Sequence, residues 1–269
     1  MKIKIPSYFF VAIFILFVQS CKKDSDPLDA MPTTFTKKVL IEEFTAEWCA
    51  ACASAFPRIQ TVMEENPNTV FAATIHSNDP FSNSQTQKIK STFSITSFPS
   101  ALVDRFAFGG STPRTSLTTS NLRNRSTERL GEPTDVGLKI ETDILKDGTA
   151  TVTVNAGHNS TITNELRLTV YLLEDNVPQV DQAGTSDPNY KHHHVLRKIL
   201  TEEKGTPLVV GTNERDFYIT SFDEIDISGY DQDNLEVIAF IHHFDESGIS
   251  DHEILNVQYA KLGEDQDWD

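Results

Sequence analysis

The stretch Glu43-Phe44-Thr45-Ala46-Glu47-Trp48-Cys49-Ala50-Ala51-Cys52 decides how the first half of this chain is interpreted. It continues the mostly apolar segment 38–44, which predicts a strand, and it precedes apolar residues at helical spacing from Phe56 onward. Cys49 is therefore expected where a strand passes through a short turn into the first turn of a helix. Unsatisfied backbone N–H groups and the helix dipole favour an anion there, which lowers the pKa of a thiol.

The two cysteines form a Cys-x-x-Cys pair, a pattern that fits a redox pair, half of a zinc site, or chance. Cys52 lies one helical turn after Cys49, near enough to attack a mixed disulfide formed there. A structural zinc site needs four ligands, and the only other cysteine is Cys21, which is expected to be alkylated. Zinc would need two histidines from elsewhere, so the redox interpretation is favoured and zinc is the alternative.

Working outward, strands and helices alternate in the first half. A strand is expected at 70–75, a helix around 89–93, and a further strand at 101–103, which Phe98-Pro99 opens. A polar helical segment at 117–130 follows. This order predicts an α/β domain over residues 35–132.

The second half has a different pattern. From Asp135 the hydrophobic period changes from helical to twofold, and Asp147-Gly148 predicts a hairpin turn. Further strands are expected at 166–172, 208–210, 217–219, 235–244 and 254–262. A set of about seven strands without a convincing helix predicts a β-sandwich of immunoglobulin-like type over residues 133–264.

The N-terminus has the features of a secretion signal. Lys2 and Lys4 precede an apolar run at 8–18, which is too short for a transmembrane helix of about twenty residues. Val18-Gln19-Ser20-Cys21 resembles the lipobox of bacterial lipoproteins, in which the cysteine thiol receives diacylglycerol. Residues 1–20 are thus predicted to be a lipoprotein signal peptide. An ordinary signal peptide with an incidental cysteine is the alternative.

Residues 21–34 are polar and contain two prolines, so they are expected to tether the folded part to the membrane. Lys22 follows the modified cysteine, and in the lipoprotein sorting rule the absence of aspartate there favours the outer membrane. The net charge of −16 becomes −18 once Lys2 and Lys4 are removed. Such a surface repels nucleic acid and anionic headgroups, so membrane attachment is expected through acyl chains such as palmitate.

The cysteine stretch, with Pro57 and Phe98-Pro99, resembles the thioredoxin superfamily. The resemblance implies that Glu43 is buried behind the pair and relays protons, and that Pro99 is a cis-proline facing the disulfide. Trp48 and Phe98 would shape the substrate surface. Glu43 replaces the aspartate of thioredoxin, and Ala50-Ala51 replace Gly-Pro, which leaves the reduction potential open. A partly exposed carboxylate at Glu43 and an ordinary edge-strand proline at Pro99 are the structural alternatives.

A narrower resemblance covers the mature chain. The opening Glu42–Cys49, the β-rich second half and the segment Tyr190-Lys191-His192-His193-His194-Val195-Leu196-Arg197 look like the twenty-eight-kilodalton outer-membrane lipoprotein family. That family combines a thioredoxin-like domain with a β-domain, and its physiological role is poorly defined. The resemblance therefore implies a fold and a location rather than an activity.

The histidines invite a metal hypothesis, because His192 and His194 would lie on one face of a strand. Exposed histidines in a sandwich are more often ordinary polar side chains in contact with solvent, so no metal site is predicted. The acidic run 231–234 is expected to be a solvated turn rather than a calcium site.

These features predict a lipid-anchored envelope thiol–disulfide oxidoreductase. Cys49 would be the nucleophile, Cys52 the resolving thiol and Glu43 the proton relay, with no dissociable cofactor. Its partners would be thiols or disulfides of envelope proteins, and reduction or isomerisation is favoured over oxidation. The alternative is a surface binding or adhesion lipoprotein whose thioredoxin-like domain is a scaffold and whose β-domain binds a protein or glycan. Either face of the outer membrane is compatible with the sequence.

Overall fold

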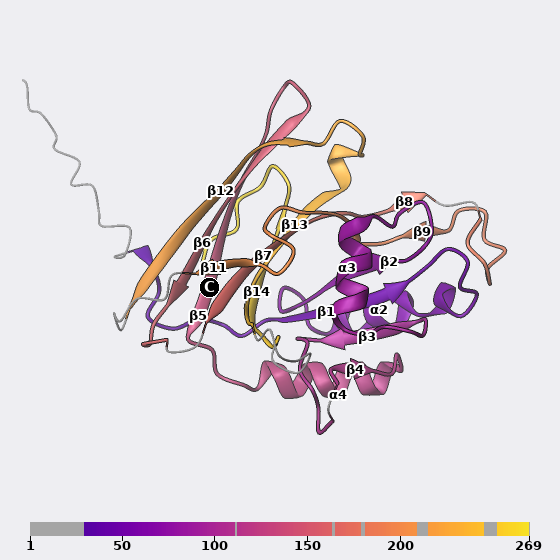
Figure 1. Cartoon of the computed structure of the whole chain (residues 1–269), viewed down its shortest axis with the longest axis horizontal. Helices are drawn as coiled ribbons and strands as arrows, with labels where there is room; N and C mark the ends of the chain where they lie inside the picture. Colours follow the sequence, from indigo (N-terminus) through magenta and orange to yellow (C-terminus); the bar gives the residue numbers. More distant parts are fainter. Residues whose placement is uncertain are drawn as a thin grey trace, which may run out of the picture.

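The structure is a computed structural model, and it describes residues 30–110, 112–162, 165–178, 181–208, 215–244 and 252–268. The predicted signal peptide, the lipidation site Cys21 and most of the tether lie outside these residues. Within them the chain is mostly β-sheet with few helices, arranged around a mixed sheet (Figure 1). No helix in this part of the chain is long and apolar enough to cross a membrane.

The elements follow the predicted change of pattern at about residue 133. The first half contains β1 (Val39–Thr45), η1 (Cys52–Ser54), α2 (Phe56–Glu65), β2 (Val70–His76), α3 (Ser84–Thr92), β3 (Ser100–Val103), β4 (Arg114–Thr115) and α4 (Thr119–Leu130). The second half contains β5 (Val136–Ile144), β6 (Thr149–His158), β7 (Leu166–Glu174), β8 (Val177–Pro178), β9 (Lys191–His192), β10 (Val195–Ile199), β11 (Thr206–Leu208), β12 (Asp216–Asp226), the 3₁₀ turn η2 (Gln232–Asn234), β13 (Leu235–His243) and β14 (Ile254–Lys261).

β1 is central to the first half and is buried along its whole length. It pairs in parallel with β2 and antiparallel with β3, and β3 pairs with β4. Val39 and Ile41 pack on the side of α2 and α4, whereas Leu40 and Phe44 pack on the side of α3. Because helices cover both faces, the strand reads as an almost continuous apolar run.

The sheet continues from the first half into the second. Its strand order is β14-β13-β7-β10-β2-β1-β3-β4, and β11 also pairs with β7. β10 joins the two halves: it lies parallel to β2, and Thr74 N–H donates to the His194 carbonyl at 2.8 Å. The predicted boundary between residues 132 and 133 falls between α4 and β5, but the hydrogen-bonded sheet spans it.

A second, three-stranded sheet of order β12-β6-β5 packs over the β7, β13 and β14 end of the large sheet. Leu168, Val170 and Leu172 of β7 point into the core between these two sheets, which also contains residues of β5 and β6. Tyr171 and Leu173 point the other way, into the core that includes α3. The second half is therefore a two-layer β structure, one layer of which belongs to the large mixed sheet.

The last strand, β14, packs against β1 and β2 of the first half. β14 contacts the start of β1, where Lys38 N–H donates to Asn256 Oδ1 at 2.9 Å and Lys37 Nζ donates to the Ile254 carbonyl at 3.1 Å. Tyr259 of β14 stacks on Phe71 of β2 with ring centroids 5.3 Å apart. The core of the first half is thus completed by the last strand.

Candidate functional site

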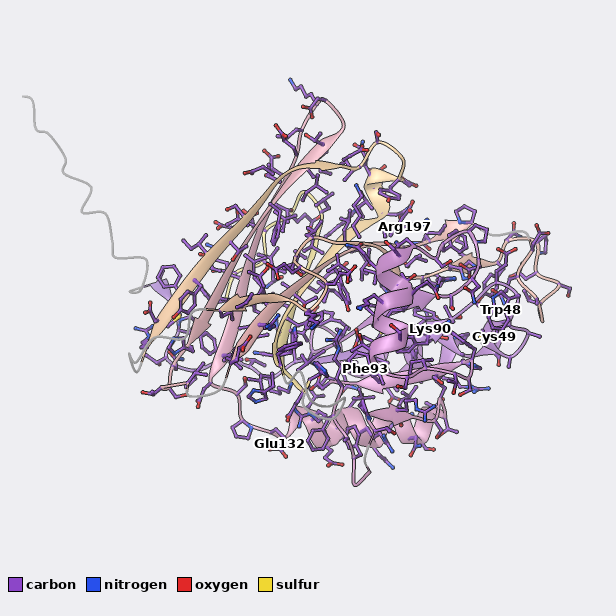
Figure 2. The ribbon with its side chains drawn as sticks, in the orientation of Figure 1. Trp48, Cys49, Lys90, Phe93, Glu132 and Arg197 are labelled. Atoms are coloured by element: carbon purple, nitrogen blue, oxygen red, sulfur yellow. A yellow bond between two sulfur atoms is a disulfide. The ribbon has the colours of Figure 1, made fainter. Side chains whose placement is uncertain are left out.

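Cys49 and Cys52 form a disulfide, with their Cα atoms 5.3 Å apart. The pair lies at the end of the molecule away from β5, β6 and β12, where Figure 2 labels Trp48 and Cys49. Cys49 is 7% exposed and Cys52 is 2% exposed. Cys49 is thus the more accessible of the two sulfur-bearing residues, although neither is open to solvent.

The local backbone differs from the expected first turn of an α-helix. Residues 49–51 form a turn, η1 follows, and α2 begins only at Phe56. Cys52 N–H donates to the Cys49 carbonyl at 3.0 Å, and Ala55 N–H donates to the Cys52 carbonyl at 2.9 Å, which is the three-residue spacing of a 3₁₀ helix. Pro57 explains the change, because its missing N–H interrupts the α-helical ladder at this point. Cys49 still lies at the N-terminal end of a continuous helical segment.

Glu43 is buried on the face of β1 that points toward α2. It is 1% exposed, and neither of its carboxylate oxygens has a hydrogen-bond partner. Burial raises the pKa of the Glu43 carboxyl from 4.5 to about 8, against a smaller lowering by the Arg58 guanidinium. A carboxyl with this pKa can hold a proton near neutral pH and release it to a neighbouring group.

Trp48 and Phe98 form the aromatic part of the site. Trp48 is 51% exposed, its Nε1 donates to the Ser77 carbonyl at 2.9 Å, and its ring meets Phe98 edge-on at 5.3 Å between centroids. Phe98 packs against the cluster of Cys49 and Cys52. The peptide bond between Phe98 and Pro99 is cis, directly before β3. Both cysteines and both aromatic residues therefore share one surface.

Two residues of the second half also contribute to this surface. The sequence did not predict their contribution. Gln182 Nε2 donates to the Cys49 carbonyl at 3.1 Å, and Ala183 N–H donates to the Glu47 carbonyl at 2.8 Å. Both residues lie in the long loop between β8 and β9. The available signal in the sequence was the long stretch without hydrophobic periodicity between residues 174 and 191, because long loops in compact domains often carry function.

A row of polar rings, the buried His76 and His192 and the half-buried Tyr190, reaches the neighbourhood of Glu43. The Tyr190 and His192 rings are 5.1 Å apart, His192 and His76 are 4.7 Å apart, and His76 Nδ1 lies 2.6 Å from Asp79 Oδ2. Burial, and then proximity to Glu43, raises the pKa of Tyr190 to about 12. Burial, and then His76, lowers the pKa of His192 to about 3, so this imidazole is neutral. The Nε2 atoms of both histidines are buried without partners.

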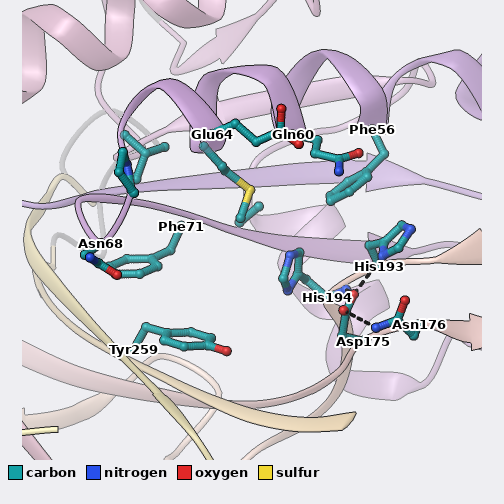
Figure 3. Close-up of a pocket in the computed structure, with 14 residues that line it drawn as sticks. Phe56, Gln60, Glu64, Asn68, Phe71, Asp175, Asn176, His193, His194 and Tyr259 are labelled. Atoms are coloured by element: carbon teal, nitrogen blue, oxygen red, sulfur yellow. Dashed lines mark hydrogen bonds and ion pairs between the residues drawn. The ribbon is translucent and has the colours of Figure 1, made fainter.

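His193 and His194 lie elsewhere, in a pocket of about 490 Å³ beside α2 (Figure 3). His193 stacks on Phe56 with centroids 5.0 Å apart and lies 2.8 Å from Asp175, and His194 lies 2.6 Å from Glu236. The rest of the lining combines the apolar side chains of Phe56, Met63, Val70, Phe71 and Tyr259 with polar ones, namely Gln60, Glu64, Asn68 and Asn176. The three consecutive histidines therefore lie in two different environments: His192 is beside His76 and Tyr190, whereas His193 and His194 line the pocket.

The structure gives no support to a metal site at the histidines. Within the described ranges, no group of three or more histidine, cysteine or acidic side chains is placed to hold a metal ion. In the acidic run 231–234, Asp231 caps its own turn: it accepts hydrogen bonds from Asp233 N–H and from Asn234 Nδ2. These contacts agree with a turn at this position.

The arrangement as a whole is compatible with two-electron thiol chemistry. It holds a Cys-x-x-Cys pair that forms a disulfide, a buried acid with a raised pKa on the adjoining strand, and an exposed tryptophan beside the pair. These are the components needed for a nucleophilic thiol, a proton acceptor and a contact surface.

Comparison with known families and structures is consistent with this architecture. The family model described as outer membrane protein Omp28 matches residues 86–266. No curated protein matches the chain.

Among solved structures, HBP35 of Porphyromonas gingivalis is similar with a TM-score of 0.74 and 25% identity, over 85% of this chain and 76% of that one. Protein AGR_C_4864 from Agrobacterium tumefaciens is similar in fold, with a TM-score of 0.58 and 12% identity, over 85% of this chain and 96% of that one. A domain of the outer membrane lipoprotein Omp28 from Porphyromonas gingivalis is 18% identical, with a TM-score of 0.32, over 48% of this chain and 89% of that domain.

Proposed function

This chain belongs to the Omp28 family of outer membrane proteins, and we propose that it works there as a lipid-anchored thiol–disulfide oxidoreductase. The observation that carries the proposal is the Cys49–Cys52 disulfide in the segment that follows β1, with the unpaired carboxyl of Glu43 buried on that strand. The outer membrane location follows from the family. The lipid at Cys21 and the direction of electron flow belong to the proposal.

The proposal includes a finer assignment of the fold. Residues 35–132 form a thioredoxin-like unit, for which the order β1-α2-β2-α3-β3-β4-α4 and the parallel pairing of β1 with β2 are the supporting features. Residues 133–264 form a β-sandwich unit of immunoglobulin-like type, supported by the packing of the β12-β6-β5 sheet on β7 and β13. The two units share the large sheet through β10.

In the favoured direction the reduced protein reduces or isomerises a substrate disulfide. The Cys49 thiolate attacks one substrate sulfur, which forms a mixed disulfide and expels the other substrate sulfur as a thiolate. In molecules whose Glu43 is ionised, Cys52 then gives its proton to the Glu43 carboxylate, and its thiolate attacks Cys49 Sγ to release the second substrate thiolate. Two electrons pass to the substrate and the Cys49–Cys52 disulfide forms. A dithiol reductant of the envelope restores the reduced pair, and no dissociable cofactor takes part.

A second candidate is a surface binding or adhesion lipoprotein, in which the thioredoxin-like unit is a scaffold. The pocket in Figure 3 is the observation that favours it, because its volume and mostly apolar lining are those of a small-molecule or side-chain site. In this alternative a protein or glycan partner binds outside the cysteine site, and the disulfide is purely structural.

Trapping of mixed disulfides separates the two candidates. In Cys52→Ser the thiol that expels the substrate is missing, so reductant-sensitive adducts should accumulate in acid-quenched, alkylated envelope extracts. Cys49→Ser should trap far less, because Cys52 is the more buried sulfur. The double variant Cys49→Ser/Cys52→Ser is the control. Equal or absent adducts on both single variants would reject the oxidoreductase and favour the binding protein.

A further inference from the structure

Residues 181–184 of the second half lie against residues 47–50, the turn that carries Cys49. We call residues 181–184 the strap. Two hydrogen bonds hold it: Gln182 Nε2 to the Cys49 carbonyl at 3.1 Å and Ala183 N–H to the Glu47 carbonyl at 2.8 Å. Gln182 is 5% exposed, so its side chain is packed against the turn, whereas Asp181 and Gly184 are exposed. The strap therefore contacts the turn at two places: at Glu47, and at the proposed nucleophile Cys49 itself.

Gly184 shows how closely the two backbones approach. Its φ is +85°, and a Cβ at this position would lie 2.1 Å from the Ala50 carbonyl oxygen. A side chain there would be strained by the backbone conformation and would also collide with main-chain atoms that cannot move aside. Only glycine lets the strap sit directly on the Ala50 peptide, between the two cysteines.

The strap lies against the main chain of Glu47, Cys49 and Ala50, so it borders the proposed nucleophile. Phe98 packs against the buried cluster of Ala46, Cys49 and Cys52, and the Trp48 ring meets Phe98 edge-on. With these groups in place Cys49 is only 7% exposed, although a nucleophilic thiol must reach its substrate. A cysteine on the broad surface of a folded protein cannot approach such a recessed sulfur unless the strap, Phe98 or Trp48 moves.

We propose that the strap is a specificity-determining element, which admits a cysteine on an extended peptide segment and excludes one on the surface of a folded protein. This inference rests on the proposed oxidoreductase function and names its substrate class. Gln182 supplies a second feature. Its Oε1 is buried without a partner, and this acceptor suits a backbone N–H of an entering segment, since an extended peptide carries unpaired donors along its length.

Chemical accessibility tests the strap without any redox turnover. The full chain is reduced, and modification of Cys49 by iodoacetamide and by a bulky polyethylene-glycol maleimide is followed by peptide mapping. Gly184→Ala displaces the strap, and Gly148→Ala is the matched control, with a φ of +81° and no atom closer than 3.5 Å to the added Cβ.

Gly184→Ala should raise the maleimide rate about tenfold and the iodoacetamide rate less than about twofold, because losing the strap's hydrogen bonds shifts the closed population by roughly that factor. Gly148→Ala should change neither rate. Equal maleimide rates in wild type and a Gly184→Ala protein of unchanged circular dichroism would overturn the proposal, and so would an equal rise in Gly148→Ala.

Substrate choice is tested with two disulfides of known structure. Reduced wild type should react faster with a flexible cysteine peptide carrying a thionitrobenzoate leaving group than with a folded protein whose surface cysteine carries the same group. Gly184→Ala should lose most of this preference. Gln182→Met keeps the side-chain length but removes both Oε1 and the Nε2 donor to the Cys49 carbonyl, so it should raise KM for the peptide and also lower the preference for the peptide over the folded protein. Equal preference in wild type and Gly184→Ala would overturn the specificity assignment.

The two proposals fail in different ways. If reduced wild type exchanges with neither disulfide, the oxidoreductase function is rejected, while the two alkylation rates still decide whether the strap covers Cys49. If wild type exchanges with both at equal rates, the function stands and the strap's role in choosing substrates is rejected.

Discussion

Glu42 and Glu43 are adjacent in β1, but their carboxylates point to opposite faces of the sheet and only that of Glu42 is paired. Glu42 accepts hydrogen bonds from Arg105 at 2.7 and 2.8 Å and from the Tyr171 hydroxyl at 2.9 Å. Both Glu43 oxygens are buried without a partner. Both carboxylates are buried, but they differ in their partners: that of Glu42 joins the two halves of the fold, and that of Glu43 has no hydrogen-bond partner.

Glu43→Gln should increase stability at high pH and change it little at low pH. Between 4.5 and about 8 the folded protein keeps the Glu43 proton that the unfolded chain has released. The free energy of unfolding of wild type therefore falls as pH rises through this window, in total by a few kcal/mol, and glutamine removes that dependence. Urea unfolding without reductant, from about pH 5 to about pH 9, measures the difference. Parallel pH profiles of the two proteins would contradict a buried, protonated Glu43.

Glu42→Gln, the matched substitution one residue earlier, should destabilise the protein. Removing one partner of a buried ion pair leaves the Arg105 charge uncompensated in the core, which typically costs about 3–5 kcal/mol. Arg105 also packs on Phe93 and Phe240, so it cannot turn out to solvent without losing these contacts. The same urea series at neutral pH provides the measurement. A loss below about 1 kcal/mol would mean that water reaches the pair.

His192→Asn should weaken the acid sensitivity of folding. The His192 pKa falls from 6.5 to about 3 in the folded protein, so below pH 6.5 the unfolded chain binds a proton that the folded protein does not. This histidine therefore destabilises the fold as pH drops, by about 2 kcal/mol between pH 7 and pH 5. The difference in unfolding free energy between wild type and variant should shrink by that amount over this range. A constant difference would place His192 in contact with solvent.

Cys21→Ser should abolish acyl labelling and release the protein from membranes. The prediction rests on the short apolar run at 8–18 and the small-residue junction before Cys21. Metabolic labelling with a fatty acid, followed by fractionation of wild type and variant, provides the test. Equal recovery of both proteins with the membrane would show that attachment does not depend on this cysteine.

Local sequence was sufficient to find one side of the candidate site. Trp48, Cys49 and Cys52 are within a few residues of one another, and the strand before them and helix after them follow from hydrophobic spacing. The exception is the backbone at the cysteines, where Pro57 forces a 3₁₀ turn instead of the expected α-helical turn. Gln182 and Tyr190 come from a distant loop with no periodic pattern, so only tertiary structure could place them there.

The alternation of apolar and polar residues also could not predict that the two halves share one sheet. The twofold period from Val136 predicts strands with one exposed face, which suits β5 and β6. The run Val237–Ile241 is apolar at every position, and the structure buries β13 on both faces. This continuous run was a signal for a strand covered on both sides, although the sequence does not state which neighbours cover it.

Because β10 and β14 complete the core of the first half, the order in which the segments of the chain emerge matters for folding. A polypeptide that emerges from its N-terminus presents β1 and β2 long before residues 195–199 and 254–261 arrive to cover them. Until then the outer edge of β2 is an unpaired strand, the kind of surface that recruits other chains. The interval between emergence of the cysteines and arrival of the last strand is therefore a period in which this protein needs protection from aggregation, and in which its two thiols are most open to mispairing.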